Sequence, residues 1–228
     1  MGNEELTAAI AFQLGPLQVT YTVVTTWVIM AALTLACWLT TRRLQIEPGL
    51  VQTAMEGIVS TIKEAIHGAA PDQSRLLLPF IGTLWAFLVI ANLSGLIPGV
   101  HSPTRDLSAT AALAFLVFLS VHWFGIRSRG LKDYLHHYIK PSPILLPFNI
   151  ISEITRTIAL AVRLFGNMMS LEMAALLILL VAGFLAPIPI LMLHIIEALV
   201  QAYIFGMLAL IYVAGGLQSQ KLQLQNKE

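Results

Sequence analysis

Long uninterrupted runs of apolar residues dominate the chain, and they predict helices that cross a membrane. Five stretches carry no Asp, Glu, Lys or Arg: residues 6–41, 76–104, 107–126, 173–193 and 198–220. Each is long enough to span a bilayer, which takes ~20 apolar residues. We therefore predict an all-α polytopic membrane protein with five membrane-crossing helices in one membrane domain over residues 1–228.

The last two apolar segments are too long for simple spans. We expect three ordinary spans at 19–41, 76–98 and 108–126, after an N-terminal segment over 1–18 that lies outside. Residues 144–184 as one helix would measure roughly 60 Å at 1.5 Å per residue, against a hydrocarbon core of ~30 Å. A steeply tilted helical hairpin over 143–217, turning near Pro187 and Pro189, reconciles length with thickness.

Residues 49–66 follow a different pattern, with apolar positions recurring every four residues at Leu50, Ala54, Ile58, Ile62 and Ile66. Polar residues fill the opposite side. This periodicity predicts an amphipathic helix lying on the cytoplasmic face of the membrane. A short soluble cap packed on the loops would show the same pattern and is the alternative.

The distribution of positive charge predicts the orientation. Ten of the 13 Lys and Arg residues fall in segments that five crossings place on one side: Arg42, Arg43, Lys63, Arg75, Arg127, Arg129, Lys132, Lys140, Lys221 and Lys227. Arg105 is the one base of the opposite loops. Because cytoplasmic loops are enriched in Lys and Arg, we expect the N-terminus outside and the C-terminus in the cytoplasm.

Composition excludes several other classes of protein. The chain is 57% hydrophobic and 11% charged, whereas soluble domains run nearer a quarter charged, so there is no room for a soluble domain. The single cysteine, Cys37, excludes a disulfide framework or a Cys-based metal site. We expect no metal, no cofactor and no nucleic-acid partner.

The predicted hairpin nevertheless contains ionisable residues: Glu153, Arg156, Arg163, Glu172, His194 and Glu197. A charged side chain at the bilayer centre costs at least ~2.5–3.5 kcal/mol, so an intramembrane charge is by default a functional candidate. Arginine is the extreme case, because its guanidinium cannot lose its proton in a protein.

Helical spacing separates these residues into two groups. At 100° per residue, Arg156, Arg163, Asn167 and Ser170 share one face. Glu172 lies nine residues after Arg163, which is ~13.5 Å along an ideal helix and about 180° round it. The two residues therefore do not form a local pair, and Arg163 can meet a carboxylate supplied by something else.

His194, Glu197 and Gln201 form a second stripe, at i, i+3 and i+7 of the last helix. In the predicted topology Glu172 and His194 both fall in the outer half of the membrane. A carboxylate and an imidazole near each other can pass a proton at physiological pH.

Several motifs resemble subunit a of the F-type rotary ATP synthases, over nearly the whole chain. "RLFGN" at 163–167, with a glutamate nine residues after its arginine, is similar to the family's arginine motif. "HIIEALVQAYIF", with its histidine seven residues before Gln201, "PFNIISEITR", "ANLSGLIPG" and "PTRDLSATAALA" are similar to further family segments. The arginine motif combined with the downstream His and Gln is specific.

The resemblance implies a role for each of these residues. Arg163 would face a rotating ring of subunit c helices, favour the ionised form of each ring carboxylate, and bar direct proton passage between two offset aqueous half-channels. Glu172 and His194 match outer half-channel positions, and Asn167 and Gln201 match polar positions near the ring contact. Glu197 is a carboxylate that many relatives lack.

The resemblance also implies a setting. The chain would be a non-catalytic subunit of a bacterial inner-membrane complex, in contact with the subunit c ring, the peripheral stalk subunit b, other ATP synthase subunits and lipid. Asn92, Ser170 and Glu153 are candidates for half-channel lining. Asn92 could equally join two helices by a hydrogen bond, and Glu153 could pair with Arg156.

Other interpretations stay open at this point. The complex could carry sodium instead of protons. Arg163 could be structural, neutralised by Glu197 or a lipid phosphate, and His194 could be a packing residue. A secondary transporter should show a repeat, and an intramembrane enzyme should show a catalytic motif; we find neither. We expect His122, near an interface, to be solvated.

Overall fold

Long helices make up most of the chain, after a short β-hairpin. The computed structural model describes residues 10–14, 17–42, 45–46, 49–97, 100, 102–130, 145–182 and 188–225. Its helices are α1 (Tyr21–Thr41), α2 (Leu50–Ala69), α3 (Ser74–Ser94), α4 (Leu107–Arg129), α6 (Leu145–Ala182) and α7 (Ile188–Gln225). Short 3-10 turns, η1 (Pro71–Gln73) and η2 (Pro103–Arg105), precede α3 and α4.

Five of these helices are long and apolar enough to cross a membrane, namely α1, α3, α4, α6 and α7. This result confirms the predicted all-α polytopic class. The antiparallel hairpin of β1 (Ile10–Leu14) and β2 (Leu17–Thr20) was not expected from the sequence. Residues 1–9, the turn at Pro187, and Arg43, Lys132, Lys140 and Lys227 lie outside the described residues.

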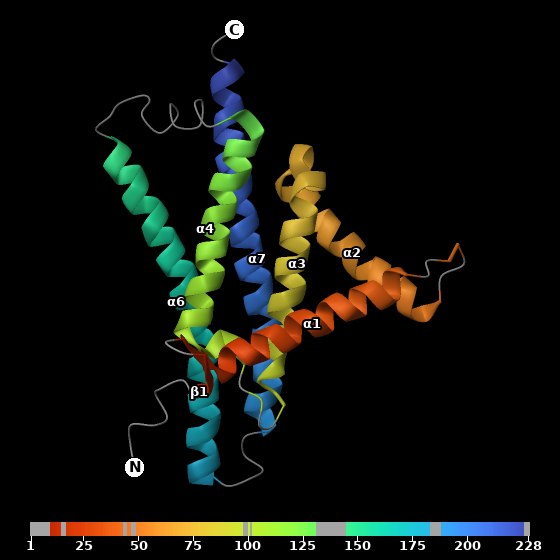
Figure 1. Cartoon of the computed structure of the whole chain (residues 1–228), viewed down its shortest axis with the longest axis vertical. Coiled ribbons are helices and arrows are strands. Elements are labelled where there is room, and N and C mark those ends of the chain that lie inside the picture. Colours follow the sequence, from red (N-terminus) through yellow and green to blue (C-terminus); the bar gives the residue numbers. More distant parts are fainter. Residues whose placement is uncertain are drawn as a thin grey trace.

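Helices α3, α4, α6 and α7 alternate in direction and pack side by side, with α7 between α3, α4 and α6 (Figure 1). Helix α1 instead runs across α3 and α7 in this view and packs on α3 and η2 (Figure 1). The first helix is therefore oriented differently from the bundle, which its sequence pattern did not indicate.

Small residues on α7 allow this close packing. Ala202, Ala209 and Ala214 are buried among larger side chains of α3, α4 and α6. Small residues at helix interfaces let two backbones approach closely in a membrane protein. At Gly206 the approach is especially close, because a Cβ there would overlap Nε1 of Trp85 on α3.

The outer faces of α6 and α7 are apolar and exposed. Exposed apolar side chains on these helices include Ile150, Ile151, Ile154, Ile158, Val162, Met173, Leu176, Leu177, Ile196, Val200, Ile204 and Ile211. Soluble monomers rarely expose apolar area of this extent. These faces therefore suit lipid or the helices of a partner.

Helix α2 packs on the bundle only near its C-terminal end. Ile66 is fully buried, and Ile62 lies 3.8 Å from the Cβ position of Gly82 on α3. The apolar residues of its first half, such as Leu50, Val51 and Ile58, stay exposed. The amphipathic pattern is thus only partly satisfied by packing within the chain.

We predict that Gly206→Ala destabilises the protein, because the new methyl group would overlap the Trp85 indole and overpacking costs ~1–3 kcal/mol. Gly215→Ala on the same helix is the matched control, since a Cβ there meets nothing within 4 Å. Thermal aggregation of the detergent-solubilised protein measures the effect. Equal aggregation temperatures for the two variants would contradict this packing.

Candidate functional site

Arg163 lies on the exposed side of α6. Among the residues that the structure describes, it has no hydrogen bond and no ion pair. The exposed apolar residues Ile158 and Val162 lie on the same helix close by. A permanent cation on an apolar surface requires water, a lipid headgroup or an anion from another molecule.

Two contacts between α6 and α7 bracket Arg163. On one side Nδ2 of Asn167 donates to Oε1 of Gln201 at 2.6 Å. On the other side the guanidinium of Arg156 lies 4.6 Å from the ring centroid of Tyr212. The face predicted for Arg156, Arg163 and Asn167 is therefore turned toward the side of α7. Among the described residues, Arg163 alone of the three has no hydrogen bond, ion pair or ring contact with α7.

Glu172 forms an ion pair with Arg105 of η2. Both side chains keep 34% of their surface exposed. Sequence reasoning noted Arg105 only as the single base of the outer loops and assigned it no partner. The sequence carries only a weak signal for this contact, because Asp106 directly follows Arg105 and is an equally possible acidic partner.

Asn92 on α3 is fully buried and joins three segments. Its Nδ2 donates to the carbonyl of Ala198 on α7 at 3.1 Å, and its Oδ1 accepts from Thr104 at 2.8 Å. Oγ of Ser102 lies 2.7 Å from both Oγ1 of Thr104 and the carbonyl of Ala91. Because a hydroxyl carries one proton, Ser102 can donate to only one of them at a time.

His194 is buried beside this network, with 8% of its surface exposed. Its Nε2 has no hydrogen-bond partner in the described part of the chain and lies 3.9 Å from the Cβ position of Gly95. Nε2 of Gln201 is also buried and unpartnered there. Buried polar atoms are nearly always hydrogen-bonded, so two such atoms on one stripe of α7 mark a site that needs polar occupants.

Glu172 and His194 do not form an ion pair with each other in the described part of the chain. The Glu172 carboxylate pairs with Arg105 of η2, whereas Nε2 of His194 lies near Gly95 at the end of α3. Both lie beyond the Asn167–Gln201 contact, on the far side from Arg156. The segment Ser102–Arg105 links their surroundings, because it contacts Asn92 at one end and Glu172 at the other.

The remaining predicted residues are spread over the hairpin. Glu197 is half-buried on the same stripe as His194 and Gln201, with no ion pair among the described residues. Ser170 is exposed, and its hydroxyl donates to the carbonyl of Asn167 at 3.2 Å. Glu153 lies on α6 at the α4 interface, where its Oε2 is 3.8 Å from Nε2 of His122.

His122, which we expected to be solvated rather than a ligand, is partly exposed and partly packed. Its side chain retains 29% exposure, packs on the Phe118 ring with centroids 4.4 Å apart, and faces Glu153. Apolar periodicity could not have found this contact, because α4 has nearly the same mean apolar character all round. The contact depends on how α4 and α6 pack.

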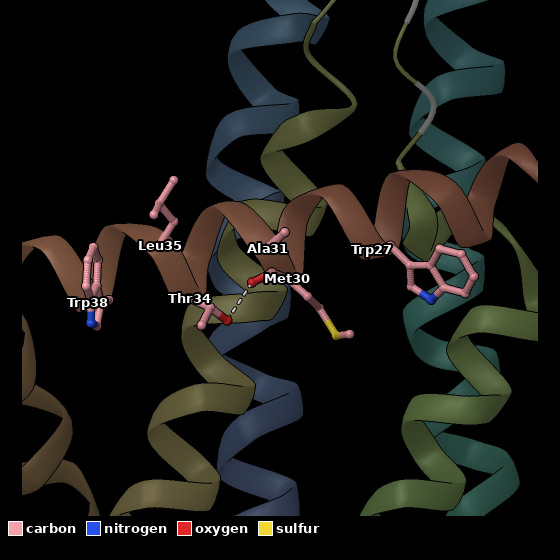
Figure 2. Close-up of a pocket in the computed structure, with 6 residues that line it drawn as sticks. All are labelled: Trp27, Met30, Ala31, Thr34, Leu35 and Trp38. Atoms are coloured by element: carbon pink, nitrogen blue, oxygen red, sulfur yellow. Dashed lines mark hydrogen bonds between the residues drawn. The ribbon is translucent and has the colours of Figure 1, made fainter.

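One surface hollow shares no lining residue with any of these sites. It measures about 610 Å³ and is lined by Trp27, Met30, Ala31, Thr34, Leu35 and Trp38 of α1 (Figure 2). Its one hydroxyl, on Thr34, donates to the carbonyl of Met30 in the same helix. This hollow offers no titratable group, so it is not the candidate ion path.

Comparison with known proteins gives one family. The profile described as ATP synthase A chain matches residues 23–214. ATP synthase subunit a 2 of Pelobacter propionicus is 65% identical over 217 residues, covering 95% of each chain. ATP synthase subunit a of Legionella pneumophila (strain Corby) is 57% identical over 228 residues, covering 100% of this chain and 99% of the relative. The chain therefore belongs to the ATP synthase A chain family, the membrane subunit a of ATP synthases.

Proposed function

We propose that this chain is the proton-translocating subunit a of an F-type ATP synthase, and that Arg163 couples proton flow to rotation of a subunit c ring. The observation that carries the proposal is the exposed Arg163, which has no acidic partner in the described part of its own chain. A carboxylate on a partner helix would supply the missing anion. Subunit a itself would be non-catalytic, with ATP chemistry in other subunits.

The exposed apolar faces of α6 and α7 support a rotating contact at this position. Side chains such as Val162, Val200 and Ile204 offer a smooth apolar surface on which another helix can slide. Each arriving ring carboxyl would lose its proton near the fixed charge of Arg163. The membrane potential supplies ~2.3 kcal/mol per proton per 100 mV, so many small steps are needed for each ATP.

The outer half-channel would follow the polar seam between η2, α3 and α7. Glu172 with Arg105 lies at one edge of the seam, and Asn92, Thr104 and His194 continue it. Gln201 and Asn167 then lead to the neighbourhood of Arg163. The unpartnered nitrogens of His194 and Gln201 are suited to water, which would connect groups that do not touch directly.

The inner half-channel would lie on the other side of Arg163, toward the start of α6. Glu153 is the candidate lining residue of this inner path. Ser170 is a further candidate lining residue, on the surface of α6 that would face the ring. A proton arriving from outside would reach this second path only after travelling round on the ring, because Arg163 separates the two paths.

We further propose a bacterial inner-membrane location, with the N-terminus outside, the C-terminus in the cytoplasm, and contacts to subunit b and lipid. Helices α6 and α7 each have 38 residues, which is ~57 Å of helix. This length exceeds the ~30 Å hydrocarbon core, so the two helices would cross it at a tilt or extend beyond it.

Replacing Arg163 by alanine should abolish ATP synthesis and ATP-driven proton pumping, because nothing would then discharge the ring carboxyl or separate the half-channels. ATP-driven acidification of vesicles that hold the assembled complex measures this. Wild-type complex should pump without added sodium; a strict sodium requirement would favour the sodium-translocating alternative, in which Glu197 adds a carboxylate to the path. Coupled pumping by assembled Arg163→Ala complex would refute the proposal.

Glu172→Ala and His194→Ala should each reduce passive proton flux severely, because both lie on the seam proposed for proton uptake. The measurement uses vesicles stripped of the catalytic head. Glu197 lies three residues from His194 and could carry part of the flux in the His194 variant. Wild-type flux in the double variant would show that protons enter elsewhere, leaving the role of Arg163 standing.

The exposed apolar first half of α2 supports its placement on the cytoplasmic membrane surface. In a Cys37→Ser background, Gln52→Cys and Glu56→Cys should react with membrane-impermeant thiol reagents added from the cytoplasmic side, because on the polar face Glu56 is exposed and Gln52 is partly exposed. Inverted and right-side-out vesicles separate the two sides. Labelling from outside alone would overturn the proposed orientation.

A further inference from the structure

His122 of α4 and Glu153 of α6 meet on the side of Arg163 opposite the outer seam. Nε2 of His122 lies 3.8 Å from Oε2 of Glu153, with 29% and 19% of the two side chains exposed. Glu153 precedes Arg163 by ten residues, which is ~15 Å along α6. The pair therefore lies toward the end of the bundle where α3 begins near Arg75 and α4 ends near Arg127 (Figure 1).

The hydrogen bond of the second imidazole nitrogen selects the tautomer that a neutral His122 ring would adopt. Nδ1 of His122 lies 2.9 Å from the carbonyl oxygen of Phe118. A carbonyl oxygen can only accept, so Nδ1 carries the hydrogen and a neutral ring presents a lone pair at Nε2. That lone pair faces a carboxylate oxygen. Two acceptors that face each other can bind one proton between them, either directly after a small approach or through a water.

A small cavity beside the pair has room for that water. It measures about 20 Å³ and lies between α4, α6 and α7, lined by Val117, Phe118, Val121, Glu153, Arg156, Thr157, Leu160 and Tyr212. A water needs a cavity of about 10–15 Å³ and two or more polar partners. Glu153, Arg156 and Thr157 provide polar groups in its wall.

The surrounding side chains hold the pair in place. Phe118 packs against the His122 ring, and Thr157 donates to the carbonyl of Glu153 at 2.9 Å. Arg156 is anchored over the Tyr212 ring of α7, which keeps a permanent positive charge in the cavity wall. Arg156 and Tyr212 are the charged and titratable groups that line this cavity besides Glu153 itself.

We propose that His122 is a second proton-binding group of the inner half-channel, acting beside Glu153, an inference that rests on the function proposed above. A ring carboxylic acid that reaches Arg163 gives its proton to water, and the water passes one proton to the Glu153 carboxylate or to Nε2 of His122. The pair then releases this proton to water on the cytoplasmic side and returns to its starting state. During ATP hydrolysis the same steps run in reverse.

The test uses assembled complex in head-stripped vesicles and measures passive proton flux. Glu153→Gln and His122→Gln should each lower the flux by about tenfold or more, in keeping with the loss of a general acid–base group. The double variant should lose no more than the single ones, because the two groups share one proton. Glu56→Gln and His67→Gln on exposed positions of α2 are matched controls and should keep full flux.

Chemical rescue separates a proton-carrying role from a structural one. Formate should restore flux to Glu153→Ala, and imidazole should restore it to His122→Ala, when each is added on the cytoplasmic side but not on the outer side. Normal flux in the assembled Gln variants, or lost flux that neither compound restores, would overturn the inference. If Arg163→Ala is still uncoupled in that case, the proposed function stands; if Arg163→Ala also pumps, both fail.

Discussion

A guanidinium keeps its proton under all conditions that a protein meets, so an arginine on an apolar helix face must have an anion or water beside it. This constraint applies to Arg163, which lies on the exposed side of α6. Its neighbours Arg156 and Asn167 both reach α7, yet Arg163 has no ion pair among the described residues. The features proposed here for proton transport follow from a charge that no ion pair within the described part of the chain balances.

The packing of α7 makes this arrangement possible. Alanines and Gly206 let α3, α4 and α6 approach it closely, and the tight contact at Trp85 fixes the level of α3 against α7. That level brings Asn92 to the carbonyl of Ala198, between His194 and Gln201. The polar seam and the exposed apolar face are thus two sides of one packed unit, so the proton path and the partner-facing surface proposed above lie on different sides of it.

Much of the fold could be predicted because hydrophobic length and periodicity depend on the chain alone. The five apolar helices and the amphipathic α2 were visible in this way, and the helical angle of 100° correctly grouped Arg156 and Asn167 on the face that meets α7. The crosswise α1 and the β-hairpin were not visible, because they depend on contacts between segments.

The sequence indicated the individual candidate residues of the site but not the contacts that they make. Helical spacing predicted that Glu172 and His194 lie at similar depth in the membrane. It could not show that Arg105 forms an ion pair with Glu172 or that Gly95 lies beside His194. These contacts arise from the loop before α4, whose path no periodicity describes. His122 was missed for a related reason, since its contact with Glu153 depends on the packing of α4 against α6.

The central claim is that the anion facing Arg163 belongs to another subunit. A high-resolution structure of the whole membrane complex, with the distance measured from the Arg163 guanidinium to the nearest carboxylate, tests it most directly. We expect a carboxyl-bearing helix of a ring subunit to lie opposite Arg163, with no acidic side chain of the same chain within 4 Å. An ion pair between Arg163 and Glu197, or a lipid phosphate bound at Arg163 in place of a ring helix, would contradict the account.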